Sequence, residues 1–483
     1  MLCGGQLAAK CISEARYLIK EDLKILSNTL GIDITLVDDD ILTITLNQSQ
    51  TQATRASDIW VSDDPKDTNL LIQLLSIFIQ QGIAVNIIPD FDAAASLSED
   101  EAGELRELVS SNFGTTNPKY RIWISQIDKL VQRKIIQDKG RQFDVLRGSE
   151  IVHKEGGVRL PWHERIEDID DLKSLVNQKS CVVLKTNQEG YDGNGVIIVN
   201  NTVIENFREC LSEYTAFEYV DIDKSYSQVV VVNMDGSLSF YPLVEYYEAE
   251  ETHKLLYATT VVDDEIEEKQ GDIKDFTINA MQALSVEGRV VPGVYALEFL
   301  QGSDGSLVLC EIAPRTHNSG HGTDTRNVHG VHGISQHKAQ VLAPLGIGIK
   351  ESELPSINML TINLLSEVSK NLQTQDNLQV ELQLNGQKLN TPEDLENWLN
   401  SLGSSESNIG QYGIDWEVLN YHKYKKAEFG FGETRPAGKL NLGKHGDINI
   451  EIINPNNVNI SNLVEFITSH LKYVAVRLKT IQN

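Results

Sequence analysis

The stretch that decides the fold is VYALEFLQGSDGSLVLCEI, residues 294–312. Alternating apolar runs flank Asp304-Gly305, which predicts a β-hairpin because both turn residues tolerate positive φ. If these two residues form the whole turn, Ser303 faces Ser306 and Glu298 lies directly opposite Glu311. Carboxylates opposed on one sheet face have Cβ atoms roughly 5 Å apart, repel each other, and need a shared proton or a cation. The pair therefore predicts a Mg²⁺ site, unless one glutamate is exposed and a strand bulge offsets the other.

A second hairpin precedes this one in the sequence. QVVVVNMDGSLSFYPLV, residues 228–244, has Asp235-Gly236 at its turn. Two further apolar strands, Val182–Leu184 and Val196–Val199, flank a glycine-rich loop. The middle of the chain is therefore predicted to be α+β, with an antiparallel sheet.

The two ends of the chain have different patterns. Helical and strand signals alternate near the N-terminus, which predicts a parallel α/β domain; the expected elements are helices at 6–30 and 69–81 and strands at 34–37 and 83–88. A surface helix or loop is expected near residues 94–105. Beyond residue 345, strands at 359–364 and 447–453 and a helix near 461–472 predict a smaller, loop-rich domain.

Composition narrows the possible partners and the compartment. The chain has 483 residues, with 42 Lys plus Arg against 69 Asp plus Glu, a net charge of -27. That balance argues against duplex nucleic acid, which needs a basic face. Five scattered cysteines without a CxxC pair predict a reducing cytoplasm rather than a disulfide framework. The apolar runs are too short for a membrane span, so a cytoplasmic protein is expected.

Lys185 ends the strand CVVLK and precedes the loop GYDGNG at 190–195. Backbone N–H groups of such loops can approach phosphates, and a lysine can hold a phosphate as a point charge. Taken alone, a plain β-turn beside an exposed lysine is the simpler interpretation, because short glycine-rich loops are common.

The run EIAPRTHNSGH at 311–321 follows the hairpin. Arg315 can grip a carboxylate or a phosphate with two parallel hydrogen bonds. His317 and His321 can donate to an anion or transfer protons. A polar surface loop is an equally simple interpretation. The histidines downstream do not match a zinc spacing.

Together these motifs resemble the ATP-grasp enzymes. Within that superfamily the chain most resembles the 5-(carboxyamino)imidazole ribonucleotide synthetases, the ATPase components of phosphoribosylaminoimidazole carboxylation in purine biosynthesis. The matching segments span nearly the whole chain in order: GGQL at 4–7, Lys185 with GYDGNG, FYPLVE at 240–245, ALEF at 296–299, EIAPRTHNSGH, SQ at 335–336 and ETRPAGK at 433–439. EIAPRTHNSGH is the most specific of these.

The resemblance implies three domains. An N-terminal α/β domain (pre-ATP-grasp) would span 1–122, an ATP-grasp domain 123–345 with its lid at about 175–220, and a small C-terminal domain 346–483. The ATP-binding residues would be Lys129, Lys185, Gly190, Tyr191, Asp192, Gly193 and Glu218, with Glu218 on the nucleoside. Mg²⁺ would be held by Glu298 and Glu311, and the catalytic residues would be Arg315, His317 and Asn318. The substrate would be bound by Gly5, Gln6, Ser319, His321, Arg435 and Lys439.

The implied activity is an ATP- and Mg²⁺-dependent carboxylate–amine ligase that works through an acyl or carboxy phosphate. Its partners would be bicarbonate or another carboxylate and a small amine, with no nucleic acid or membrane, and homodimer formation is a further expectation. Two alternatives are the same chemistry on a different amine in specialised metabolism, and a nucleotide-binding regulatory protein without turnover.

This sequence departs from the family pattern at several positions. Only three residues precede Gly4, where the family has a full strand. The departures among individual residues are Ala9, Glu189, Asn194, Ser225, Gly438 and the run 337–340. The residues expected to bind ATP and Mg²⁺ are mostly kept, whereas much of what is expected to bind the ribonucleotide is altered, so weak activity on that substrate is predicted.

Overall fold

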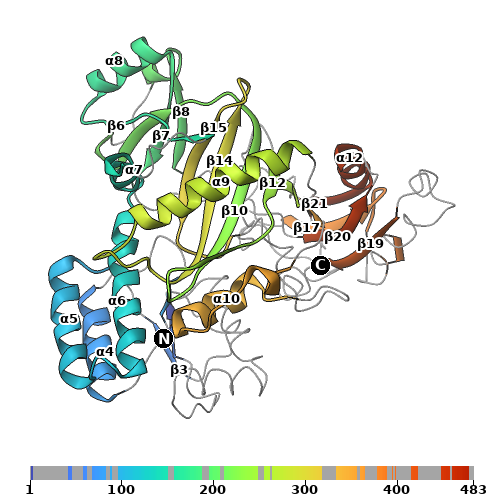
Figure 1. Ribbon diagram of the computed structural model, residues 1–483. Coiled ribbons are helices and arrows are strands. Elements are labelled where there is room, and N and C mark those ends of the chain that lie inside the picture. The colour runs from blue at the N-terminus through green and yellow to red at the C-terminus, as the bar shows by residue number, and fades with distance from the viewer. Residues whose placement is uncertain are drawn as a thin grey trace, which may run out of the picture.

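The computed structural model describes residues 2–3, 42–45, 58–61, 68–82, 87–89, 96–150, 157–187, 195–206, 211–248, 255–260, 264–317, 333–355, 359–364, 378–388, 394, 397–398, 415–421, 448–456 and 460–477. Their largest element is a ten-stranded sheet in the order β19-β20-β16-β13-β12-β10-β14-β15-β5, with β11 beside β10 (Figure 1). All its pairings are antiparallel except that of β15 with β5.

The middle of this central sheet comes from the region where both hairpins are predicted. Its strands are β5 (Val158–Arg159), β10 (Ile222–Val232), β11 (Leu238–Phe240), β12 (Val244–Glu248), β13 (Leu255–Thr259), β14 (Gly293–Gly302) and β15 (Leu307–Ala313). β10 and β14 pair over almost their whole length, and most of their side chains are buried, the polar Ser227 and Gln228 among them. They therefore form the rigid platform of the molecule.

Both predicted hairpins form, but with three-residue turns. The Gly302 N–H donates to the Ser306 carbonyl over 2.9 Å, so these two residues face each other. Asp304 Oδ1 accepts from the Ser306 N–H at 3.0 Å, and Gly305 has a φ of 81°. A left-handed glycine at the end of a three-residue turn is a common hairpin form. The predicted pairing of Ser303 with Ser306 is therefore wrong.

A β-bulge at Cys310 restores the register that the longer turn shifts. β14 and β15 pair Phe299 with Leu309, but the next pair is Glu298 with Glu311. Cys310 is the extra residue between them. The predicted opposition of Glu298 and Glu311 is confirmed, because the two one-residue offsets cancel.

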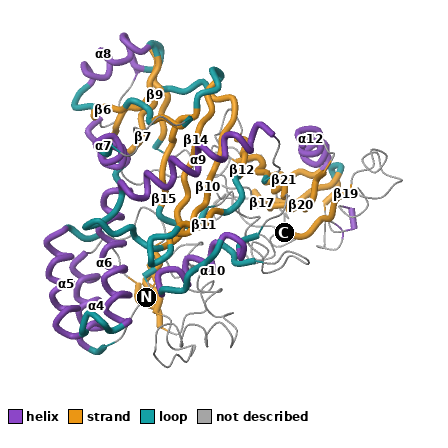
Figure 2. Tube along the Cα trace, in the orientation of Figure 1, coloured by secondary structure: helices purple, strands orange, loops and turns teal. Residues whose placement is uncertain are grey.

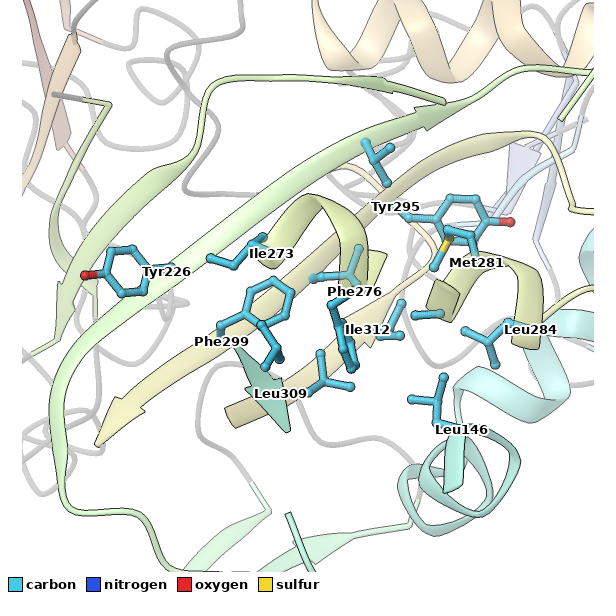
Figure 3. Packing of buried hydrophobic residues seen from close by; sticks show 14 of the residues in the cluster. Leu146, Tyr226, Ile273, Phe276, Met281, Leu284, Tyr295, Phe299, Leu309 and Ile312 are labelled. Carbon is cyan, nitrogen blue, oxygen red and sulfur yellow. The ribbon is translucent and has the colours of Figure 1, made fainter. Parts of the chain in front are cut away.

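Different helices cover the two faces of the central sheet. On one face, α9 (Asp264–Ala283) runs across β10 and β14, and Figure 3 shows Ile273 and Phe276 beside Tyr226 and Phe299. The rings of Phe276 and Phe299 meet edge to face, with centroids 5.9 Å apart. On the other face, α10 (Gln336–Leu342) and the 3₁₀ turn Ala343–Leu345 pack on Val229, Val231, Val294 and Ala296.

The carboxylate pair lies on the α10 face. Ala296 and Glu298 are two residues apart on β14, so their side chains point to the same side. Ala296 belongs to the apolar cluster under α10, whereas Glu298 lies beyond it along the strand. The sheet therefore changes from an apolar to a polar surface within one side-chain repeat.

A smaller antiparallel sheet stands next to this polar surface. Its order is β6-β9-β7-β8, with β6 (His163–Arg165), β7 (Cys181–Thr186), β8 (Val196–Asn200) and β9 (Tyr214–Glu218). Helix α8 (Ile169–Lys179) packs on one face through Leu172, Leu175 and Val176. Asp168 caps this helix by accepting from two backbone N–H groups. Short 3₁₀ turns at Ile204–Asn206 and Leu211–Glu213 join the strands.

The N-terminal part has the expected parallel sheet, in the order β3-β2-β1-β4. The strands are β1 (Leu2–Cys3), β2 (Leu42–Thr45), β3 (Asp58–Val61) and β4 (Ile88–Pro89). Three helices lie together beside it in Figure 2: α4 (Thr68–Gln80), α5 (Glu99–Asn112) and α6 (Pro118–Ile136). The predicted helix at 69–81 is confirmed, and α5 agrees with the surface helix expected near 94–105. The elements predicted at 6–30 and 34–37 lie outside the described residues.

An ion-pair network around the buried carboxylate of Asp128 joins these helices to the turn that follows α9. Asp128 on α6 accepts from Arg106 of α5 at 2.8 Å and from Arg289 at 2.8 Å and 3.1 Å. Arg106 also pairs with Glu287 at 2.9 Å. The hydrogen bond from Arg289 to Asp128 raises the pKa of that guanidinium. The network fixes the N-terminal helices against the central domain.

The C-terminal part extends the central sheet. β16 (Met359–Leu364) pairs with β13, and β20 (Ile448–Asn456) and β19 (Asp415–Tyr421) follow it. A separate sheet holds β17 (Leu378–Leu384), β18 (Gln387–Lys388) and β21 (Leu471–Arg477), next to α12 (Ile460–His470). Strands from both sides of the predicted boundary at 345 thus share one sheet, and α6 likewise crosses the predicted boundary at 122. Among the helices of the described residues, none has the length and hydropathy to cross a membrane.

Candidate active site

The site is built around the carboxylates of Glu298 and Glu311, which share one face of β14 and β15. Two opposed carboxylates and the phosphates of a nucleotide are a donor set that suits Mg²⁺. Within the described parts of the chain, no group of three or more His, Cys, Asp and Glu side chains is arranged to hold a metal. Two carboxylates supply only part of the octahedral oxygen shell of Mg²⁺, and substrate oxygens and water would supply the rest.

Lys139 neutralises one of these carboxylates. It begins helix α7 (Lys139–Gly148), which Asp138 caps, and its ammonium group donates to Glu311 Oε2. Burial alone would raise the pKa of Glu311, but the charges of Lys139, Lys185 and Arg315 outweigh burial and lower it. Glu311 is therefore ionised at neutral pH, as a metal ligand must be.

Helix α7 is held in place by Gln142. Its side chain donates to the Ile312 carbonyl at 2.8 Å and accepts from the Ile312 N–H at 3.1 Å. Gln142 therefore substitutes for a neighbouring strand at this point of β15. Since Lys139 is one turn away on the same helix, this contact sets the height of its ammonium group above the carboxylates.

The sequence analysis assigned Lys129, rather than Lys139, to the phosphates. In the structure, Lys129 is buried on α6 and donates to the Ile87 carbonyl at 3.3 Å. Its ammonium group lies about 4.0 Å from the place that a Cβ on Gly293 would occupy. Gly293 is five residues from Glu298 along β14, which is roughly 17 Å. The assignment of Lys129 to the phosphates stays a prediction, and in the structure its ammonium group contacts the N-terminal domain at Ile87.

Lys185 forms the other side of the site. From β7 it donates to the Cys310 carbonyl at 3.0 Å, and its ammonium group lies 5.2 Å from the centre of the Phe217 ring. Lys185 thus connects the small sheet to Cys310, the bulge residue directly before Glu311. Burial raises the pKa of the Cys310 thiol to about 11, so this cysteine is protonated at neutral pH and is not a nucleophile.

His317 contacts the other carboxylate. Its Nε2 lies 2.6 Å from Glu298 Oε1, and its Nδ1 lies 3.3 Å from the Ser227 hydroxyl. Ser227 and Glu298 are directly paired on β10 and β14. The imidazole is buried and spans the two neighbouring strands. Arg315 lies two residues earlier, and its charge contributes to lowering the pKa of Glu311.

Glu218, predicted to contact the nucleoside, is held by a cation. Arg159 donates to its two carboxylate oxygens at 2.7 and 2.8 Å. The bidentate pair connects the end of β9 to β5 at the edge of the central sheet. A base bound here would meet a neutralised carboxylate rather than a free one.

Several predicted site residues lie outside the described residues. They are Gly5, Gln6, Gly190, Tyr191, Asp192, Gly193, Asn318, Ser319, His321, Arg435 and Lys439. Of the others, the structure brings together Lys185, Glu298, Glu311, Arg315 and His317. It adds Lys139 and Ser227, which no local motif singled out.

Gly195 is the residue at which the loop after Lys185 returns to β8. Its carbonyl accepts from the Thr186 N–H at 2.9 Å, and its φ is 79°. A Cβ at this position would lie 2.4 Å from Thr186 Oγ1 and 2.8 Å from Thr186 Cγ2. Glycine is therefore required here for its left-handed backbone and for the close approach of the two strands.

We expect Gly195→Ala to strain this loop by about 2–3 kcal/mol, measured as faster protease cleavage between residues 187 and 195. Gly236→Ala is the matched control, because Gly236 has a φ of 84° but open space around its Cβ position. The control should cost only about 1–2 kcal/mol. Adding Thr186→Ala to Gly195→Ala should recover the difference. Equal cleavage rates in the two single variants would contradict the steric argument.

The comparisons with known proteins agree with this geometry. A family model described as the ATP-grasp domain matches residues 152–328. These residues include the small sheet, the carboxylate pair and His317. The chain therefore contains an ATP-grasp domain, and the predicted fold is confirmed.

Curated relatives match about half of the chain. Phosphoribosylaminoimidazole carboxylase from Candida glabrata is 29% identical over 245 residues, which are 48% of this chain and 40% of that protein. N5-carboxyaminoimidazole ribonucleotide synthase from Staphylococcus haemolyticus is 26% identical over 248 residues, 49% of this chain and 62% of that protein. The chain thus spans less than two thirds of the length of either relative.

Among solved structures, N5-carboxyaminoimidazole ribonucleotide synthetase from Thermotoga maritima matches with a TM-score of 0.58 at 19% identity. The match covers 98% of both chains. At this identity the likeness shows the fold alone, and it extends the shared architecture beyond the ATP-grasp domain to nearly the whole chain.

Proposed function

We propose that this chain, which contains an ATP-grasp domain, is an ATP- and Mg²⁺-dependent carboxylate–amine ligase. The observation that carries the proposal is the opposed pair Glu298 and Glu311, with Lys139 and Lys185 beside it and His317 bound to it. Negative side chains for a cation and positive side chains for phosphates meet in one place, which suits phosphoryl transfer from ATP to a carboxylate.

The proposed reaction has two steps. A carboxylate oxygen attacks the γ-phosphorus of ATP, which gives an acyl or carboxy phosphate and ADP. The amine then attacks the activated carbon, and phosphate leaves with the former carboxylate oxygen. Mg²⁺, held by Glu298 and Glu311, would supply positive charge to the phosphate oxygens.

The residues of this chain have separate tasks in that scheme. Lys139 and Lys185 bind phosphate oxygens as point charges, and Lys185 also ties the small sheet to the bulge at Cys310. Arg315 is placed to bind the planar carboxylate. The small sheet lies beside the site and would help to exclude water, which would hydrolyse the activated intermediate.

The names of the relatives suggest the first substrates to test. Bicarbonate and 5-aminoimidazole ribonucleotide are the pair implied by the curated relatives. The substituted positions in the sequence predict a weak response to that ribonucleotide, and a different amine is the alternative acceptor. The carboxylate, the amine and a homodimeric state are all parts of the proposal.

The test is ADP release with Mg²⁺, ATP and bicarbonate over a panel of amines that includes the ribonucleotide. Amine-dependent ADP release, matched by formation of the carboxylated amine, is the expected result. Release with the ribonucleotide alone would assign the purine reaction, and release with a different amine would assign a specialised ligase. ATP binding without amine-dependent turnover across the panel would instead support a regulatory nucleotide-binding protein.

A further inference from the structure

Gln336, the first residue of α10, lies against the backbone of His317. Its side chain is fully buried. Its amide oxygen accepts from the His317 N–H at 2.8 Å, and its amide nitrogen donates to the His317 carbonyl at 2.8 Å. One side chain thus satisfies both main-chain groups of one residue, as a neighbouring strand would do. Strand β15 ends at Ala313, so His317 has passed the end of the β14–β15 ladder.

Gln336 is itself held by a rigid support. The Ser335 hydroxyl caps the helix by accepting from the Lys338 N–H at 3.1 Å. One turn later, Ala339 and Leu342 pack on the face of β10 and β14 that also carries Glu298. The position of Gln336 is therefore fixed relative to β10 and β14, and β14 bears Glu298.

The imidazole of His317 depends on this backbone anchor. It must reach Glu298 at 2.6 Å and Ser227 at 3.3 Å at the same time. Its partners are of opposite kinds, since the carboxylate only accepts a hydrogen bond and the hydroxyl can donate one. In neutral His317 this arrangement selects the tautomer with the proton on Nε2. A shift of the backbone by about 1 Å would break one of the two contacts and release the choice of tautomer.

We propose that Gln336 is a positioning residue for the active site, which fixes the orientation and tautomer of His317 and through it the orientation of Glu298. This inference rests on the proposed function for its kinetic consequence, but not for its structural one. Hydrogen bonds to metal-binding carboxylates commonly set their orientation. Gln336 acts indirectly, because it holds the backbone of His317, and the His317 side chain makes the hydrogen bond to Glu298.

The chain offers a matched control on the same helix. Gln340 is also buried, and its Oε1 accepts from the Val294 N–H at 2.6 Å. Val294 lies four residues from Glu298 on β14, roughly 13 Å away. Methionine has nearly the volume of glutamine, so Gln336→Met and Gln340→Met each remove buried amide contacts without creating a large cavity. Both variants should lose comparable thermal stability.

The experiment compares these two variants in the full chain. In Gln336→Met, Mg²⁺-dependent ATP turnover should fall about 100-fold while KM for ATP changes by less than about threefold, because misplacement by 1 Å can cost that much. Gln340→Met should retain turnover within about threefold. The second readout is the ¹⁵N spectrum of labelled histidine, with the His317 signal assigned by its loss in His317→Gln. Wild type should show a single tautomer, and Gln336→Met a mixture.

Three outcomes would overturn the inference. One is equal loss of turnover in Gln336→Met and Gln340→Met, which would make the role of Gln336 purely structural. Another is an unchanged His317 tautomer in Gln336→Met. The third is a mixed tautomer already in wild type. The spectrum requires no turnover, so a chain that proves inactive on every amine would refute the proposed function while this inference remained testable.

Discussion

Glu298→Gln and Glu311→Gln are each expected to lower Mg²⁺-dependent ATP turnover by about a thousandfold or more. The two carboxylates are directly paired on one sheet face, and each glutamine removes one negative charge without changing the shape of the side chain. Loss of one electrostatic group that acts on a developing charge typically costs 10²–10³ in rate. Loss of a ligand to the cation that bridges the phosphates should lie at the upper end.

The same two variants should differ in stability without ligands. Repulsion between the glutamates alone would predict that either substitution is neutral or slightly stabilising. For Glu311 the structure predicts a loss of stability instead, because the substitution removes a charged partner of Lys139 in a mostly buried place. The lowered pKa of Glu311 means that its pair stabilises the fold above its unfolded pKa of about 4.3, and that this stability is lost as the pH falls through the lowered value.

At pH 7 we therefore expect Glu311→Gln to lose about 3 kcal/mol of unfolding free energy, and Glu298→Gln to lose clearly less. Urea unfolding with and without Mg²⁺ measures the difference, and phosphate release at saturating Mg²⁺ measures the turnover. Glu245→Gln is a suitable control, since this buried carboxylate on β12 accepts from the Tyr247 hydroxyl and does not belong to the pair. Near-normal turnover in either Glu298→Gln or Glu311→Gln would refute the metal assignment.

The hairpin illustrates how much of this site the sequence could predict. Local pattern placed both strands and the opposition of Glu298 and Glu311 correctly. It could not predict the longer turn or the bulge at Cys310, because both depend on small backbone preferences that alternation of side chains does not record. The correct pairing resulted from two errors of opposite sign. The predicted register is thus right from Ala296 to Glu298 and wrong by one residue between the bulge and the turn.

The residues that the sequence missed are those placed by tertiary contacts. Lys139 stands at the start of a helix after Asp138, a local signal for a helix N-terminus but not for what the lysine faces. Its position depends on Gln142 and the edge of β15, 170 residues away in the chain. Glu218 was found at the expected strand end, but its pairing with Arg159 joins segments 59 residues apart. Sequence spacing does not predict contacts between residues this far apart in the chain.

Lys139 and Lys129 allow a test of placement by tertiary contacts against placement by sequence resemblance. Lys139 contacts Glu311, whereas Lys129 lies at the far end of β14 and donates to the Ile87 carbonyl. Resemblance of the sequence favoured Lys129 for the phosphates, and the geometry favours Lys139. Methionine at each position removes the charge and keeps most of the length, so the pair of variants separates the two assignments.

We expect Lys139→Met to reduce turnover by about 10²- to 10³-fold and to raise KM for ATP, because the site loses a cation that would face the phosphates. Lys139→Arg keeps the charge and should recover part of the rate. Lys129→Met should keep turnover within about threefold, while urea unfolding reports whatever stability its buried contact contributes. Steady-state phosphate release at saturating Mg²⁺ measures all three. The opposite ranking, with Lys129→Met inactive and Lys139→Met active, would return the phosphate contact to Lys129. It would also mean that the N-terminal domain contributes directly to the nucleotide site, since Lys129 lies against β4 of that domain.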